Sequence, residues 1–346
     1  VVEKIDALIA DVSPRRYYRI HHGSGPIPTS LLMELSDSHS PVGGGNRALS
    51  QSDCFVEVAA YLREHGVRVP AIYVDAREEG YLLIEDLGER LFASVLDDLL
   101  NRGFEPLTDR ITDSDRVVPQ VEKGLDLLFC LQKLPHDEDS VVFQRTPDFQ
   151  LLRKGGEEFI EFIVSPLSVG TRQLKVFQEA FDNLSEEVLS HPKVFSHYDF
   201  TSHNILVLPG SEGLALIDFQ DACLESPARD LHALLCDRGM DERLGKERLA
   251  KMFEYYHHRC GVLDISQLYS EYSVLWDTRV SGRFTKLVQV DERQKYAAWI
   301  PGTMARVVRG FERLSKKFQR FGDCLDILLP KYPNAKEWVK DKWPYL

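Results

Sequence analysis

Three side chains in the middle of the chain carry oxygen atoms at a spacing that suits phosphoryl transfer. Asp199 precedes Asn204 by five residues, and Asp218 follows after a further stretch of apolar residues. Transfer from ATP requires a carboxylate that accepts the proton of the attacking hydroxyl, and oxygen ligands that hold Mg²⁺ against the phosphates. We therefore predict Asp199 as the catalytic base and Asn204 and Asp218 as ligands of Mg²⁺.

Two short strands are expected to bring these residues together. The apolar segments 204–208 and 214–219 flank the turn Pro-Gly-Ser-Glu-Gly at 209–213. Because a hairpin folds the chain back in register, Asp218 is predicted to lie across from Asn204. The ring of His197 is expected to pin the loop through hydrogen bonds. The order H-x-D-x4-N followed by D-F is typical of the catalytic loops of kinases.

The elements around this hairpin indicate two lobes. Strands are predicted at residues 17–20, 31–35, 71–74 and 81–84, with a helix at 52–65. Later segments have helical periodicity, at about 91–100, 118–134, 148–164 and 171–189. We predict an α+β, protein-kinase-like bilobal fold. Its β-rich nucleotide-binding lobe spans residues 1–88, and its mostly helical catalytic and substrate-binding lobe spans residues 89–346.

The segment His197-Tyr198-Asp199-Phe200-Thr201-Ser202-His203-Asn204 resembles a motif of the aminoglycoside phosphotransferase/choline kinase superfamily, H-G-D-x-H-x-x-N. Two residues depart from that motif. Tyr198 stands where the superfamily has glycine, which changes the backbone freedom of a tight turn. Thr201 stands where it has a second histidine. Neither change removes the predicted base or metal ligands.

Other blocks are similar to bacterial anomeric kinases of N-acetylmuramate and N-acetylglucosamine. These blocks are residues 13–19, 83–88, 218–222 and 228–231. The resemblance implies that the backbone of Glu85 to Leu87 receives the adenine and that Asp221 lies near the metal or the substrate. It also implies the cofactors ATP and Mg²⁺, and that Asp230 anchors its lobe through backbone hydrogen bonds.

One expected kinase residue is missing. A kinase strand usually ends V-A-I-K, with its lysine on the phosphates, but here Met33 occupies the lysine position. Arg15 and Arg16 lie in the predicted phosphate-covering turn, and either arginine can supply the missing charge. The alternative is that both are ordinary surface residues. Glu57, on the following helix, is either the usual partner of that lysine or a solvated helix residue.

The acceptor is predicted to be a small molecule, best an amino sugar phosphorylated at its anomeric hydroxyl. Aminoglycosides and choline or other amino alcohols are alternatives. Arg279 and Arg283 are candidate contacts to the acceptor, although the aromatic residues around them also suit a helical core. A nucleotide-binding pseudokinase with a regulatory role is the alternative from another class, because Met33 and the two motif departures weaken the kinase pattern.

The composition excludes two classes of partner. The 346 residues include 42 Lys and Arg and 54 Asp and Glu, for a formal charge of −12. This acidity argues against nucleic acid and against anionic membrane as partners.

The six scattered cysteines suit free thiols, and a cytoplasmic protein is expected. Residues 304–321 are apolar at helical spacing, so the basic residues of this region are predicted to form the solvent-exposed side of one amphipathic helix.

Overall fold

The structure is a computed structural model that describes residues 1–8, 15–23, 25–35, 50–101, 114–210, 213–262, 264–332 and 337. Its internal packing divides the chain into two compact units. The first contains Val1–Asp113, Lys133–Thr146 and His197–Leu224, and the second contains the rest. The hairpin therefore groups with the N-terminal residues. The expected boundary at residue 88, which separates a nucleotide lobe from a substrate lobe, stays a prediction.

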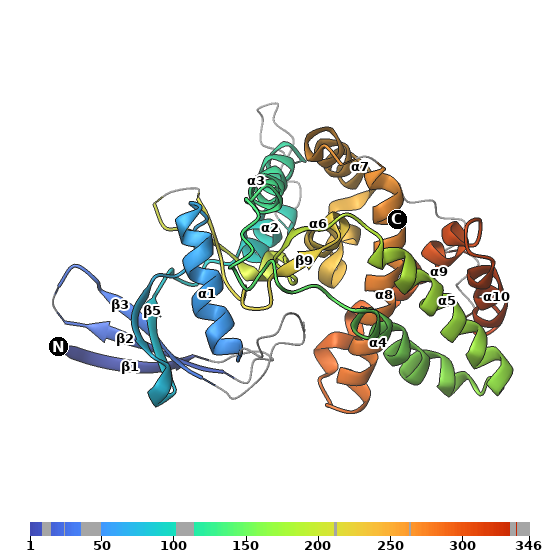
Figure 1. The fold of residues 1–346 in the computed structure, drawn as a ribbon, viewed down its shortest axis with the longest axis horizontal. Coiled ribbons are helices and arrows are strands. Elements are labelled where there is room, and N and C mark those ends of the chain that lie inside the picture. The colour runs from blue at the N-terminus through green and yellow to red at the C-terminus, as the bar shows by residue number, and fades with distance from the viewer. Residues whose placement is uncertain are drawn as a thin grey trace. The chain divides into compact units, whose positions relative to one another are not determined.

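An antiparallel sheet of five strands forms the first unit's N-terminal part (Figure 1). Its strands are β1 Val2–Leu8, β2 Arg16–His22, β3 Thr29–Glu34, β4 Ile72–Ala76 and β5 Tyr81–Glu85, in the order β1-β2-β3-β5-β4. The four predicted strands are confirmed. β1 was not predicted, because this edge strand leaves most of its side chains exposed and so lacks the apolar alternation of a half-buried strand.

Helix α1 Gln51–Glu64 matches the helix predicted at residues 52–65. It begins with a capping box: the hydroxyl of Ser50 accepts the backbone N–H of Asp53 at 3.1 Å, and the Asp53 carboxylate accepts the N–H of Ser50 at 3.3 Å. The helix buries its apolar residues on one side, and the ring of Phe55 stacks on Phe219 with 4.8 Å between centroids. This stacking joins α1 to the segment that follows Asp218.

The predicted hairpin is present in the first unit. Strands β7 Ile205–Val207 and β8 Leu214–Leu216 pair antiparallel, with Ile205 opposite Leu216. Leu87 packs with Leu206 and Ala215 in a small core beside this hairpin. Helix α2 Phe92–Asn101 follows the connector, and strand β9 Cys223–Glu225 crosses the boundary between the two units.

The second unit is mostly helical (Figure 1). Its elements are α3 Ser114–Gln132, α4 Phe149–Phe159, a π-helical turn Ile160–Val164, α5 Thr171–Leu189, β6 Val194–Ser196, α6 Pro227–Cys236, α7 Met240–Cys260, α8 Ile265–Gln289, α9 Ile300–Leu314 and α10 Gln319–Leu328, with short 3-10 turns at Ser165–Leu167, Asp237–Gly239 and Gln294–Trp299. The helices predicted at 118–134, 148–164 and 171–189 are confirmed, the second as α4 continued by the π turn.

Helices α4 and α8 cross at two glycines. A Cβ atom on Gly155 would lie 2.7 Å from the Cβ atom of Arg279, and one on Gly282 would lie 2.7 Å from the backbone nitrogen of Phe159. Real Cβ atoms essentially never approach other atoms so closely. The absence of these two side chains therefore lets the helix backbones touch.

The prediction of one amphipathic helix over 304–321 is wrong in two respects. The helix ends at Leu314, and α10 begins separately at Gln319. Arg306 and Arg309 do not face solvent, since only 3% and 8% of their surfaces are exposed. Arg306 is buried because it donates to Asp241 at 2.7 Å and to Asp277 at 2.9 Å. These two buried carboxylates compensate its charge.

All six cysteines are free, as predicted. Within the described part of the chain, no helix is long and apolar enough to cross a membrane.

Candidate active site

The loop before β7 carries the predicted base and one predicted metal ligand. The side-chain nitrogen of Asn204 donates to the backbone oxygen and to Oδ2 of Asp199, at 2.9 Å each. Asp199 is exposed, so its carboxylate can reach a substrate. Because Asn204 uses its amide nitrogen on Asp199, the amide oxygen is the atom that it offers to a metal.

The hairpin places Asn204 beside the segment that contains Asp218, as predicted. The backbone oxygen of Asn204 accepts the N–H of Ile217 at 3.0 Å. Nε2 of His197 lies 3.0 Å from the carbonyl oxygen of Ile217, so this nitrogen carries the proton and donates it. The histidine ring thus joins the catalytic loop to the residue before Asp218, which confirms the expected pinning.

Two residues at this site have left-handed backbones. Tyr198 has φ of 75° and Asp218 has φ of 62°. A residue with a side chain adopts this conformation at a cost of about 1–3 kcal/mol. The strain at Tyr198 explains why the superfamily motif places glycine there. Strained positions cluster at functional sites, and these two residues adjoin or include the predicted catalytic groups.

Arg15, not Arg16, points toward the predicted metal ligand. The Arg15 guanidinium is only 4% exposed and lies 4.0 Å from the Asp218 carboxylate. Arg16 is 71% exposed and pairs with Glu34 at 3.4 Å. Residues 9–14, which include the start of the predicted phosphate-covering turn, lie outside the described residues, and Arg16 begins strand β2. Met33 is fully buried next to Tyr17 in the β2–β3 register, so the usual lysine position belongs to the core. A contact between Met33 and a nucleotide stays a prediction.

Sequence reasoning missed three residues that hold the segment after Asp218. The amide of Gln220 donates to Asp218 at 2.9 Å. Arg145 is buried and donates to the backbone oxygens of Gln220, at 3.0 Å, and Ala222. The side-chain nitrogen of Gln51 lies 3.4 Å from Asp221. The contacts of Arg145 and Gln51 join parts of the chain that are far apart in sequence, so no local pattern marks them, whereas Gln220 lies only two residues from Asp218.

The connector after β5 lines a cavity of about 730 Å³, which falls in the usual size range of small-molecule sites. Glu85 accepts two hydrogen bonds from Arg68, at 2.6 and 2.7 Å, which hold the pKa of Glu85 below its usual value. The Asp86 carboxylate accepts from Arg19 at 2.6 Å and from the N–H of Gly88 at 3.0 Å. These ion pairs fix the shape of the connector, which holds Glu85 and Leu87 at the cavity.

The residues suit Mg²⁺ rather than a softer metal. Among the described residues, no group of three or more His, Cys, Asp or Glu side chains is arranged to hold a metal. Mg²⁺ requires no such group, because one or two carboxylates, substrate phosphates and water complete its shell. Asn204 and Asp218 supply an amide oxygen and a carboxylate that is 46% exposed. This donor set fits the ion.

Of the predicted acceptor contacts, Asp221 belongs to the first unit, and Arg279 and Arg283 belong to the second, as does the predicted anchor Asp230. Arg279 is half-buried at the α4–α8 crossing, Arg283 is exposed on α8, and Asp230 is buried on α6.

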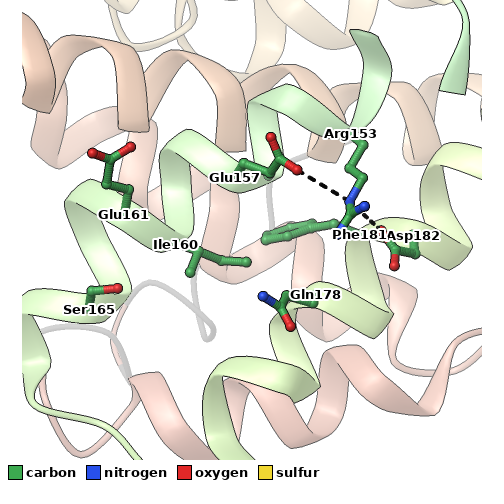
Figure 2. Close-up of a pocket in the computed structure, with 9 residues that line it drawn as sticks. Arg153, Glu157, Ile160, Glu161, Ser165, Gln178, Phe181 and Asp182 are labelled. Carbon is green, nitrogen blue, oxygen red and sulfur yellow. Dashed lines mark ion pairs between the residues drawn. The ribbon is translucent and has the colours of Figure 1, made fainter. Parts of the chain in front are cut away.

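The second unit also contains a hollow of about 260 Å³ between α4, the π-helical turn and α5 (Figure 2). Arg153 there pairs with Asp182 at 2.9 Å and with Glu157 at 3.5 Å. None of the predicted site residues lines this hollow.

The chain has the protein-kinase-like fold. A family model described as "Phosphotransferase enzyme family" matches residues 7–269, and the chain belongs to this family. It is thus an enzyme, a kinase of small molecules.

Two similar curated proteins are N-acetylmuramate/N-acetylglucosamine kinases. The one from Caulobacter vibrioides is 27% identical over 323 residues, which cover 86% of this chain and 84% of the relative. The one from Pseudomonas aeruginosa is 29% identical over 226 residues, 59% of each chain. Among solved structures, the choline kinase LicA from Streptococcus pneumoniae matches with a TM-score of 0.57 and 15% identity, over 89% of this chain and 93% of that one. The gentamicin complex of APH(2")-IIa matches with a TM-score of 0.54 and 13% identity, over 89% and 91%. These structures share the fold.

Proposed function

We propose that this enzyme transfers the γ-phosphoryl group of ATP, with Mg²⁺, to the anomeric hydroxyl of an amino sugar. The pair Asp199 and Asn204 carries the proposal, because it presents an exposed carboxylate, oriented by an amide, beside the segment of Asp218. The choice of an amino sugar is supported by the two relatives named as N-acetylmuramate/N-acetylglucosamine kinases.

In the proposed reaction the acceptor oxygen forms a bond to the γ-phosphorus, the bond from that phosphorus to the β,γ-bridging oxygen breaks, and ADP leaves. Asp199 accepts the proton of the hydroxyl, and Asn204 keeps the carboxylate oriented toward it. Asn204 Oδ1 and the Asp218 carboxylate would hold Mg²⁺. When bound, this ion neutralises charge on the β- and γ-phosphates and aligns them.

Arg15 takes the place of the missing lysine in this proposal. It is a buried cation at 4.0 Å from Asp218, and a guanidinium binds phosphate well through its fork of N–H groups. The backbone of Glu85 to Leu87 receives the nucleobase at the connector cavity. Asp221, Arg279 and Arg283 are proposed contacts to the acceptor, and Met33 is proposed to support the nucleotide site from the core behind it.

The test is ADP release from ATP and Mg²⁺ with N-acetylmuramate, N-acetylglucosamine, kanamycin and choline as separate acceptors. We expect the two amino sugars to be turned over and Asp199→Asn to lower kcat by about 10²–10⁴-fold, the usual contribution of a positioned base. ³¹P NMR of the product should show an anomeric phosphate, which acid hydrolyses readily. Equal activity of Asp199→Asn would refute the assigned base, and turnover of kanamycin or choline alone would refute the amino sugar.

The alternative from another class is a regulatory pseudokinase. The burial of Met33 favours it, because no lysine stands at the usual phosphate-binding position. Binding of Mg²⁺-ATP without phosphoryl transfer to any acceptor of a broad panel would support this alternative over catalysis.

A further inference from the structure

Four side chains of the first unit form a row that ends in a carboxylate on each side. Arg15 Nη1 lies 4.0 Å from Asp218, and Nη2 of the same arginine donates to Gln51 Oε1 at 3.3 Å. Gln51 Nε2 in turn lies 3.4 and 3.5 Å from the two carboxylate oxygens of Asp221. Gln51, the first residue of α1, therefore bridges the proposed phosphate-binding arginine and the segment that follows Asp218.

An amide suits this position because its two neighbours have opposite charges. Gln51 accepts from a cation through its oxygen and donates to an anion through its nitrogen. Glutamate would repel Asp221 and would offset the charge of Arg15. Lysine would repel Arg15. Methionine has a similar length but makes neither hydrogen bond.

The burial of Arg15 makes this contact important. Its guanidinium is 4% exposed, and a buried charge is costly unless polar groups compensate it. The ring of Phe55, also on α1, lies 5.9 Å from the guanidinium carbon. Two residues of α1 therefore fix the guanidinium, and the hydrogen-bonding one is uncharged. Kinases usually pair the phosphate-binding cation with a glutamate on the corresponding helix.

We infer that Gln51 is a positioning residue that holds Arg15 at the phosphates without placing a further negative charge beside the arginine. This inference rests on the proposed function, since it assumes that Arg15 binds ATP. The distances from Arg15 to Asp218 (4.0 Å) and to Gln51 (3.3 Å), and from Gln51 to Asp221 (3.4 Å), are long for hydrogen bonds. Such contacts at catalytic sites often shorten when the substrate binds. Gln51 acts through Arg15, so its effect should vanish when Arg15 is removed.

A double-mutant cycle tests this role. The dissociation constant of a non-hydrolysable ATP analogue with Mg²⁺ is measured by calorimetry for wild type, Gln51→Met, Arg15→Met and the double variant. We expect Gln51→Met to weaken binding about tenfold, the typical effect of a hydrogen bond to a charged group. In the Arg15→Met background the same change should weaken binding less than twofold. The matched control is Gln150→Met, which changes an exposed glutamine in the first turn of α4 and should leave binding unchanged.

Gln51→Glu tests the importance of the uncharged amide, and its equal size keeps the test valid if Gln51→Met fails to fold. We expect weaker binding of the analogue than in wild type. Unchanged binding in Gln51→Met and Gln51→Glu, or equal losses from Gln51→Met with and without Arg15, would overturn the inference. A wild type that binds the analogue but phosphorylates no acceptor would refute the proposed function alone. A wild type that binds no analogue would refute both.

Discussion

The side-chain amide of Asn204 donates to the Asp199 carboxylate at 2.9 Å, across one turn of the same loop. The same amide nitrogen reaches the backbone oxygen of Asp199, also at 2.9 Å. One asparagine thus orients the proposed base and, through its other atom, offers an oxygen to the proposed metal.

This double role predicts a large effect of Asn204→Ala. We expect kcat to fall by about 10²-fold or more, because the variant loses a metal ligand and the orientation of the base together. ADP release at saturating acceptor measures the change. Asn183→Ala on the exposed face of α5 is the control and should keep wild-type kcat. An Asn204→Ala enzyme with kcat near that of the control would exclude both roles.

The same substitution at the two neighbouring arginines should change the KM for ATP by very different amounts. Arg15→Met should raise the KM for ATP about tenfold or more, since it removes a buried cation beside Asp218. Arg16→Met should change it less than twofold, because Arg16 is largely exposed and pairs with Glu34. Steady-state kinetics with varied ATP distinguishes them. The reverse order would assign the phosphates to Arg16.

Replacing Tyr198 with glycine should lower the stability of the fold. The change relieves a left-handed backbone that costs about 1–3 kcal/mol. It also removes a ring that is only 6% exposed, and losing a buried aromatic side chain costs about 3–5 kcal/mol. The free energy of unfolding in urea should therefore fall by about 2 kcal/mol. A more stable glycine variant would show that strain outweighs packing at this turn.

Replacing Arg306, at the centre of a buried ion cluster, should strongly destabilise the fold, although this residue is far in sequence from any proposed catalytic group. Arg306→Met leaves Asp241 and Asp277 without their shared cation, and breaking such a buried pair costs about 3–5 kcal/mol. Urea unfolding measures this loss. Arg320→Met removes an exposed cation and should cost less than about 1 kcal/mol. Similar losses for both variants would contradict the burial of Arg306.

The lowered pKa of Glu271 predicts that the fold loses stability in acid. Burial raises the pKa of its carboxyl, but hydrogen bonds from His191, Lys317 and Gln267 outweigh burial and leave the pKa below its usual value. A lowered folded-state pKa stabilises the fold above the unfolded-state pKa of about 4.3. That contribution is lost as the pH falls through the folded-state pKa. Urea unfolding of Glu271→Gln should therefore depend less on pH below about 4.3 than the wild type does.

The hairpin was predictable because its residues are close in sequence. The short turn expected at 209–213 predicts the register, and the observed pairing of β7 with β8 brings Asn204 beside Ile217. The choice between Arg15 and Arg16 was not predictable, because adjacent residues at a strand face opposite sides of the sheet and the pattern does not say which side is inward.

Other features depend on contacts that local patterns do not encode. Gln51 meets Asp221, 170 residues later in the chain. Arg306 looked like a solvent-exposed helix residue because its carboxylate partners lie on α7 and α8. The edge strand β1 lacked the apolar alternation by which strands are recognised. Long-range pairing of charges and strands accounts for each of these errors.

The glycine crossing of α4 and α8 limits which substitutions the second unit can accept. A single methyl group on Gly155 or Gly282 would collide with the facing helix. Neither glycine can therefore be replaced, even by alanine, unless the two helices move apart. The backbone under Arg279 is therefore fixed in place. The proposed acceptor contacts of Arg279 and Arg283 can therefore change only by exchange of side chains, while the helices keep their spacing.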